Sequence, residues 1–189
     1  AFPASAADPD PTETRTLHAL FDRQWEDEAA RFPEWSTYKG DLRFNDKVSD
    51  ESAAALADYD AHVQQWLAEA KAIHRDKLSR TDQVSLDLKI HGLQTHQEKQ
   101  AHPGLRSLLM GALGGAQTDF AELLKNSPVA TVKQAEDILA RMAAYPRQLD
   151  QQIAQMRRGM AMGWVTSRPV LDRVLLQIDE QLPADVEQG

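Results

Sequence analysis

The chain has 189 residues, 42% of them hydrophobic, which is enough to enclose one core, so one domain or one lobe of a larger protein is expected. Its formal net charge is −8 and its densest basic feature is Arg157-Arg158, which argues against nucleic acid as a partner because phosphate binding needs a basic face. It has no cysteine, which excludes disulfides, thiolate zinc sites and cysteine nucleophiles.

The two ends of the sequence differ in composition from its interior. Residues 1–11 are small and proline-rich, which predicts a disordered mature N-terminus or tether of an exported protein, periplasmic or extracellular. A lipid anchor is one form of such a tether. The alternative interpretation is an ordinary frayed tail. Residues 12–182 are expected to form a single helical domain, and 183–189 a tail or junction. No apolar run approaches the roughly 18 residues of a membrane span.

In chain order, the first expected element is a helix over 12–31, ended by Pro33, and the segment 34–46 is expected to be a loop because it lacks a helical stripe. A second helix is expected to begin at the cap Ser49. One face of that second helix should carry Leu56, Tyr59, Val63, Trp66, Leu67, Ala70 and Ile73.

A third helix should follow the cap Ser79, with Asp82 in its first turn, and end near Gln100. Its apolar positions are broader than one stripe, which favours a helix covered on two sides: Val84, Leu86, Leu88, Ile90 and Leu93. Glycines interrupt the apolar runs between 103 and 128, so short helices are expected there.

Thr131 and Gln134 predict a capping box for a long helix that is kinked or restarted at Pro146 and ends at Gly163. Four methionines of this region are interpreted as core filler: Met142, Met156, Met160 and Met162. A last helix should begin at Ser167 and stop at Pro183. No run alternates as a strand would, so the prediction is an all-α fold, an antiparallel multi-helix array of about six or seven helices.

A helical zinc site would need two histidines at i and i+4 with a glutamate between them. No two of the six histidines are three or four residues apart, and His96-Gln97-Glu98 fails because position 100 is Gln. Asp58 with His62, and Asp87 with His91, have helical i, i+4 spacing, which is more typical of surface ion pairs than of catalytic dyads. We therefore expect no catalytic residue, no metal site and no cofactor on this chain.

Asp41 and Arg43 stand among aromatic residues in the 34–46 segment, where a guanidinium group could receive a carboxylate. The alternative is that both side chains only fasten the loop to neighbouring helix ends.

Two groups of motifs carry a resemblance to a known family. The first is Leu20-Phe21-Asp22-x-x-Trp25 with Pro33-Glu34-Trp35-Ser36-Thr37-x-x-Gly40-Asp41-x-Arg43-Phe44-Asn45-Asp46. The second runs through 131–150 and is closest over Gly159-x-x-x-Gly163-Trp164-Val165 and Arg168-Pro169-Val170-Leu171-x-Arg173-Val174-Leu175-x-Gln177-Ile178. Over about 16–178 the chain resembles the bacterial family called domain of unknown function 885.

This resemblance implies the N-terminal lobe of a larger, helical, zincin-like protein that is an exported zinc metallopeptidase. The family's His-Glu-x-x-His motif maps onto no residue of this chain, so zinc is implied for the parent protein alone. The lobe would wall the substrate cleft, and the residues expected to touch a peptide substrate are Tyr38, Asp41, Arg43 and Arg168.

Three readings remain open at this point. The chain is a lobe that pairs with a C-terminal catalytic half, from the same gene or a separate chain; or it is a stand-alone binding or scaffold module; or it is an adaptor with a groove for a partner helix. A lobe of a larger body is expected to have an exposed apolar face, which the catalytic half or self-association covers.

Overall fold

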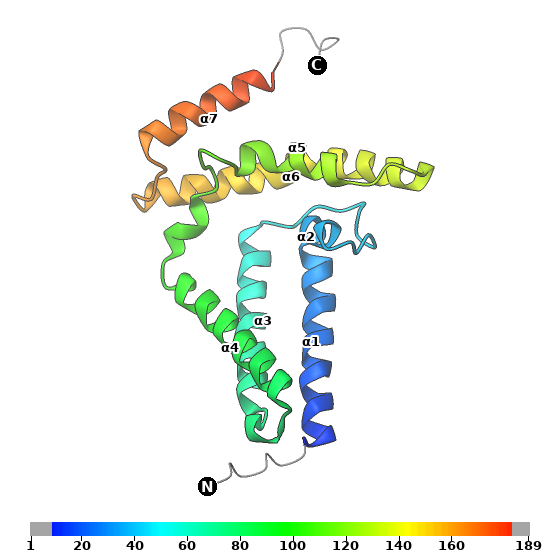
Figure 1. The fold of residues 1–189 in the computed structure, drawn as a ribbon. Coiled ribbons are helices and arrows are strands. Elements are labelled where there is room, and N and C mark those ends of the chain that lie inside the picture. Colours follow the sequence, from blue (N-terminus) through cyan, green and yellow to red (C-terminus); the bar gives the residue numbers. More distant parts are fainter. Residues whose placement is uncertain (1–8, 183–189) are drawn as a thin grey trace. The chain divides into compact units, whose positions relative to one another are not determined.

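The computed structural model describes residues 9–182, and within that range the secondary structure is helical, with no β-strand. The all-α prediction is therefore confirmed (Figure 1). The helices are α1 (Pro11–Arg31), α2 (Pro33–Tyr38), α3 (Ala53–Ala72), α4 (Arg80–Gln100), α5 (Ala116–Asn126), α6 (Val132–Ala161) and α7 (Arg168–Glu180), with short 3-10 helices η1 (Arg75–Lys77) and η2 (Pro103–Ser107). The expected tether and tail lie largely outside the described residues.

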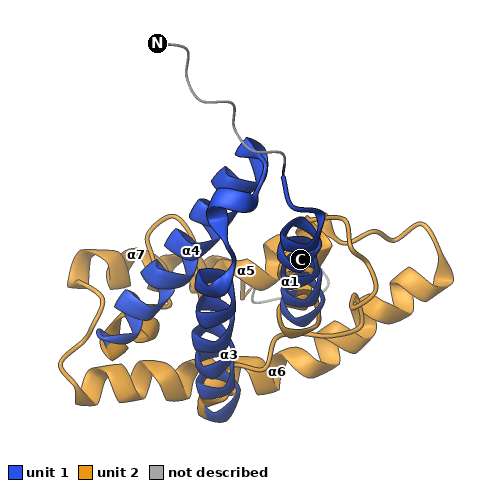
Figure 2. Ribbon diagram, turned by 90° about the horizontal axis from the view of Figure 1, so that it is seen from below, with its two compact units in different colours: residues 1–28, 54–102 blue, residues 29–53, 103–189 orange. Residues whose placement is uncertain are grey.

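The chain divides into two compact units (Figure 2). Unit 1 contains the residues up to 28 together with 54–102, and unit 2 contains 29–53 together with 103–189. Each unit is built from two separate stretches of chain. Whether 12–182 folds as a single domain stays a prediction.

Unit 1 has an apolar core drawn from α1, α3 and α4. Leu17 and Leu20 of α1 and Val63 of α3 are at most 1% exposed, and the predicted face of α3 is buried from Val63 to Ala70. On α4 only Leu86 and Leu93 are buried, whereas Val84 and Leu88 are exposed. The prediction of a helix covered on two sides was wrong, because the described neighbours of α4 pack against one face.

The predicted start of α4 is confirmed, since the Ser79 hydroxyl accepts a hydrogen bond from the backbone N–H of Asp82 at 3.1 Å. The predicted start of the preceding helix was wrong: α3 begins at Ala53. Ser49 caps nothing, because its backbone N–H and its hydroxyl both donate to Glu34. A carboxylate distant in sequence thus competes with the local cap.

Unit 2 is organised around α6. The predicted capping box at its start is confirmed: the Thr131 hydroxyl accepts from the N–H of Gln134, whose side chain accepts from the N–H of Thr131. The helix continues through Pro146 without a restart. Its last residue is Ala161, Met162 is its C-cap, and Gly163 follows with φ 79°, the left-handed conformation that terminates helices.

The most buried residues of α6 are mainly polar: Asp137, Arg141, Gln148, Gln152, Gln155 and Gly159. The interpretation of its methionines as core filler was wrong for three of them, because Met142, Met160 and Met162 are 48% to 64% exposed. The buried face of α6 therefore makes hydrogen bonds to other segments of unit 2, where apolar contacts would be usual.

Candidate functional site

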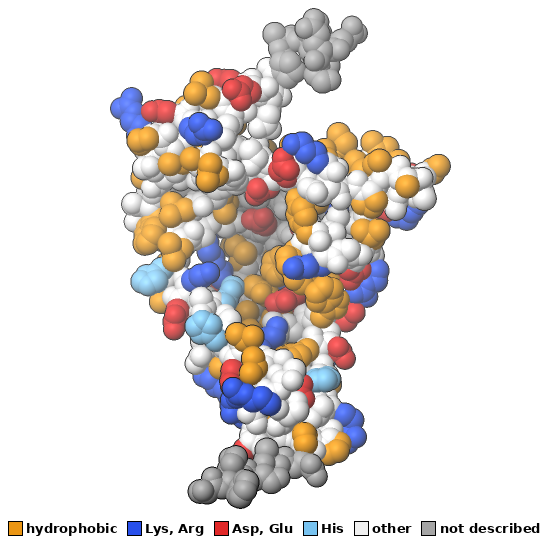
Figure 3. Space-filling view, viewed as in Figure 1, with side chains coloured by type: hydrophobic (Ala, Val, Ile, Leu, Met, Phe, Trp, Pro, Cys, Tyr) orange, Lys and Arg blue, Asp and Glu red, His pale blue; other side chains and the backbone are white. Residues whose placement is uncertain are grey.

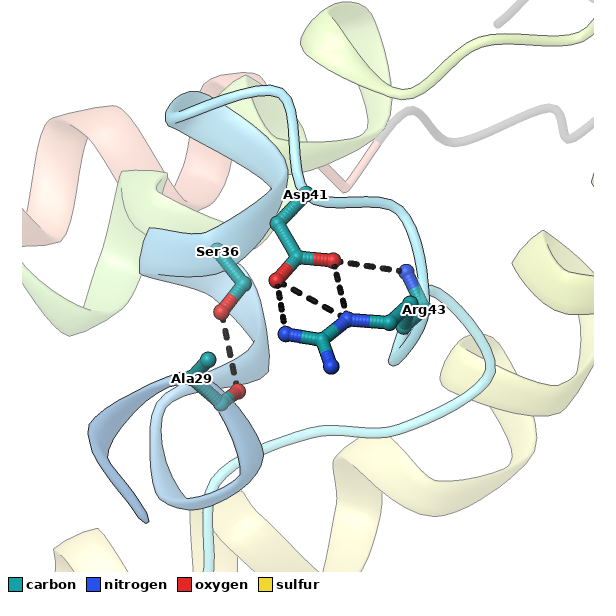
Figure 4. Close-up of polar contacts among 4 residues, drawn as sticks. All are labelled: Ala29, Ser36, Asp41 and Arg43. Atoms are coloured by element: carbon teal, nitrogen blue, oxygen red, sulfur yellow. Dashed lines mark hydrogen bonds and ion pairs between the residues drawn. The ribbon is translucent and has the colours of Figure 1, made fainter. Parts of the chain in front are cut away.

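The segment after Pro33 forms the helix α2 and a loop over 39–48, so the prediction of a loop over all of 34–46 was wrong for its first part. Proline at the first helical position favours this start. The Ser36 hydroxyl donates to the carbonyl of Ala29 at 2.8 Å, which links α2 to the end of α1 (Figure 4). The Thr37 hydroxyl lies 2.7 Å from Asn45 Oδ1 and joins α2 to its loop.

Within this loop the structure brings Asp41 and Arg43 together. Arg43 Nε donates to Asp41 Oδ1 at 2.9 Å and Nη2 donates to Oδ2 at 2.7 Å, a two-pronged pair shown in Figure 4. The guanidinium beside it holds the pKa of the Asp41 carboxyl below its usual value. The same guanidinium lies 5.3 Å from the ring centre of Phe44. Asp41 therefore occupies one edge of the fork that was expected to receive a substrate carboxylate.

Of the other two predicted substrate residues, Tyr38 is close to this pair in the sequence, whereas Arg168 is more than a hundred residues away. Tyr38 is the last residue of α2, 53% exposed, directly before the loop. Arg168 is the exposed first residue of α7, which follows the C-terminal end of α6. No described hydrogen bond or ion pair joins Arg168 to Tyr38, Asp41 or Arg43.

A residue to which the sequence assigned no role, Arg141, holds the α2 loop to α6. Its side chain is 0% exposed, Nε donates to the carbonyl of Lys47 at 2.9 Å, and Nη2 donates to the Thr37 hydroxyl at 2.7 Å. Further acceptors are the carbonyls of Pro33 and Phe44 and the Ser127 hydroxyl. Desolvation lowers the pKa of this guanidinium from its usual value, opposed first by the negative charge of Glu34.

Beside Arg141, a second group of polar side chains packs against α6; we call Glu34, Ser49, Glu51, Gln148, Gln152 and Gln155 the polar cluster. Gln148 Nε2 donates to Glu34 Oε1 at 2.8 Å, and that same oxygen accepts from the backbone N–H of Ser49 at 2.9 Å. Gln152 and Gln155 donate to the two carboxylate oxygens of Glu51 at 3.0 and 3.1 Å.

These contacts favour a structural role for the polar cluster. Glu34 accepts hydrogen bonds from Gln148 and from the backbone N–H and hydroxyl of Ser49, and Glu51 accepts from the side-chain amides of Gln152 and Gln155, so both carboxylates fasten the 33–53 segment to α6. The sequence contained one signal for the cluster, because Gln148, Gln152 and Gln155 recur at i, i+4 and i+7 on α6. Their acceptors come from the 33–53 segment about a hundred residues earlier, and no local pattern reveals that pairing.

The histidines make separate contacts within unit 1. His18 Nε2 lies 3.1 Å from Asp82 Oδ1, His62 Nδ1 3.3 Å from Asp27 Oδ1, and His96 Nε2 3.1 Å from Asp60 Oδ1. Asp87, which has i, i+4 spacing with His91, accepts two hydrogen bonds from Arg75. Over residues 9–182, no three histidine, aspartate or glutamate side chains are placed to hold a metal ion together.

Among the described helices, none combines the length and the apolar character that crossing a membrane requires.

Comparison with known families gives one match. The family model described as bacterial protein of unknown function (DUF885) matches residues 33–189, which includes α2, its loop, the polar cluster and α5 to α7. A comparison with curated proteins gives no match. The match spans most of the chain, and the chain belongs to the DUF885 family.

Proposed function

We propose that the chain is the N-terminal helical part of an exported zinc-dependent peptidase and forms one wall of its substrate cleft. The observation that supports the proposal is membership of the DUF885 family over residues 33–189. That members of this family are zincin-like peptidases is part of the proposal. A His-Glu-x-x-His motif is absent from the 189-residue sequence. In this proposal, zinc and the general base therefore belong to a catalytic part outside this chain.

The surface of α7 supports a partner of this kind. Leu171, Leu175, Ile178 and Leu182 recur at helical spacing, and Leu175 and Leu182 are 60% and 69% exposed. Val174, on another face, is 1% exposed and anchors the helix within unit 2. Because exposed apolar stripes of this size mark interaction surfaces, α7 is the element against which the catalytic part would pack.

Within the proposed cleft wall, Tyr38, Asp41 and Arg43 are the substrate-facing candidates. The Arg43 side chain is 51% exposed and its phenyl neighbour Phe44 lies alongside. Since Asp41 already neutralises one edge of the guanidinium, the pair is suited to polar groups of a peptide backbone more than to a free carboxylate. Arg168 remains a separate candidate at the start of α7.

The test uses the protein encoded by the complete gene. We expect the coding sequence to continue into a His-Glu-x-x-His segment, and the purified protein to cleave a fluorogenic peptide library, to lose activity with a zinc chelator and to regain it with added zinc. A gene that ends at Gly189, or a complete protein that stays inactive with zinc bound, would instead support a stand-alone binding or scaffold module.

The role of the loop is tested in the same protein by Arg43→Ala. We expect KM for peptide to rise about tenfold with a smaller change in kcat, because a binding contact is lost. Arg75→Ala is the matched control, since the Arg75 side chain is 47% exposed, close to the 51% of Arg43, and forms a two-pronged pair with Asp87 in unit 1. Unchanged kinetics in Arg43→Ala would remove the loop from the proposed site.

A further inference from the structure

A second apolar surface of unit 2 lies on α6. Large apolar side chains recur along it with the alternating three- and four-residue spacing of a coiled-coil seam. The seam consists of Leu139, Met142, Leu149, Ile153, Met156 and Met160, with Pro146 at the remaining position. Leu139 and Met160 are both 64% exposed and Met142 is 49% exposed. Figure 3 shows hydrophobic side chains also gathering at the end of unit 2 where α6 begins.

The most buried face of α6 is a different one, and of the seam the residues Leu149, Ile153 and Met156 are half-buried while those toward its ends are exposed. Gln148, Gln152 and Gln155 are the buried residues, and each precedes a seam residue by one position. One position corresponds to about 100° around an α-helix. The polar cluster thus supplies hydrogen-bond partners to the glutamines on one side of α6. The exposed seam residues Leu139, Met142 and Met160 lie on another side and have no described partner.

The charges beside the seam are self-complementary. Asp150 and Arg157 are exposed, lie seven residues apart and flank the seam on the same edge. If two copies of α6 cross antiparallel about a two-fold axis with Ile153 opposite Met156, then Leu149 faces Met160 and Asp150 faces Arg157 of the second copy. The axis creates this ion pair twice. In a parallel pairing Asp150 and Arg157 would instead face Tyr145 and Gln152 of the second copy, which are uncharged, so the ion pair would not form.

We propose that this seam is the docking site for a second copy of the chain, which binds as an antiparallel α6 pair. The seam from 139 to 160 is about 33 Å long, or three heptads, which corresponds to an interface at the lower end of stable dimers and to affinity in the micromolar range, on the order of 1–50 μM. The inference does not depend on the proposed peptidase function, which rests on family membership and α7.

Sedimentation equilibrium of the 189-residue protein from about 1 to 300 μM tests the pairing. We expect a reversible monomer–dimer equilibrium, and Met160→Lys is expected to raise the dimer dissociation constant at least about tenfold because it places a charge against Leu149 of the second copy. Leu88→Lys is the matched control: Leu88 is 66% exposed on α4, and this change should leave the equilibrium unaltered. A wild-type protein that is monomeric throughout overturns the proposal.

A charge exchange identifies the occupant. Asp150→Arg and Arg157→Asp are each expected to weaken the dimer about tenfold, since two ion pairs become two repulsions. The double variant D150R/R157D should recover wild-type affinity, because each exchanged residue then faces its exchanged partner. A double variant as weak as the single ones would show that the two residues do not meet across a two-fold axis, and would overturn the antiparallel pairing.

Discussion

At the scale of single residues, Arg141 is the most informative position in unit 2. Its buried guanidinium donates hydrogen bonds to three neutral acceptors. These are the Thr37 hydroxyl on α2, the carbonyl of Lys47 in the loop after α2, and the hydroxyl of Ser127, the C-cap of α5. A buried donor set of this kind is costly to remove because the acceptors lose their partners while staying out of water.

We therefore expect Arg141→Met to lower the free energy of unfolding by about 3 kcal/mol in urea titrations. Arg141→Lys should recover only part of the loss, since one ammonium group cannot span acceptors spread around a planar fork. The exposed Arg158 on the same helix is the control, and Arg158→Met should change stability little. Equal effects at both positions would contradict a tethering role for Arg141.

A second prediction at this scale concerns Asp82 in the first turn of α4. Hydrogen bonds from His18 and Ser79 lower the pKa of its carboxyl from the ordinary value of 3.8. A carboxyl whose pKa is lower in the folded state contributes stability above pH 3.8, and that contribution is lost as pH falls through the folded-state pKa. Asp82→Asn should therefore flatten the fall in the urea midpoint of unfolding below pH 4, and a fall as steep as in the wild type would contradict this role of Asp82.

At the scale of elements, η2 and the C-terminal end of α6 approach too closely for a side chain. A Cβ added at Gly159 would lie 1.9 Å from Ser107 Oγ, and one added at Gly104 would lie 2.1 Å from Trp164 Cγ. Gly92 on α4 is the opposite case, because nothing lies within 4 Å of its added Cβ. Of the two glycines within α-helices, Gly159 has no room for the methyl group of alanine and Gly92 has room for it.

We expect Gly159→Ala to destabilise the protein by about 2 kcal/mol through this clash, in thermal or urea unfolding. Gly92→Ala should stabilise it by up to about 1 kcal/mol, because alanine is the better helix former. If Gly159→Ala were also stabilising, the close approach of η2 to α6 would be wrong.

At the scale of the whole molecule, each of the two units has its own buried side chains, with Leu86 at 1% exposure in unit 1 and Val174 at 1% in unit 2. Separately packed units often open as separate cooperative segments. We expect Leu86→Ala to cost about 3 kcal/mol and to raise amide hydrogen exchange within 54–102 while 132–161 keeps its protection. Val174→Ala should produce the reverse pattern. Uniform loss of protection in both variants would show that residues 12–182 unfold as the single domain expected from the sequence.

The sequence by itself determined the helices whose signals are local. Apolar periodicity located α1, α3 and α6, and the side-chain caps Ser79 and Thr131 located two starts, because a cap bonds only to residues two or three positions away. Family membership was also contained in the sequence, through motifs such as Arg168-Pro169-Val170-Leu171.

Only the tertiary structure decided which face of each element is buried and which polar groups meet. Ser49 has the sequence context of a helix cap, but in the structure it donates to Glu34. The acceptors of Arg141 and of the α6 glutamines lie in the 33–53 segment, about a hundred residues away in the chain. Those contacts reverse the usual arrangement of α6, so that polar side chains are its most buried ones and the apolar seam is half-buried in its middle and exposed toward its ends. Periodicity can show that a helix has two faces, but burial depends on which partner packs against it, and that partner is not encoded within the helix.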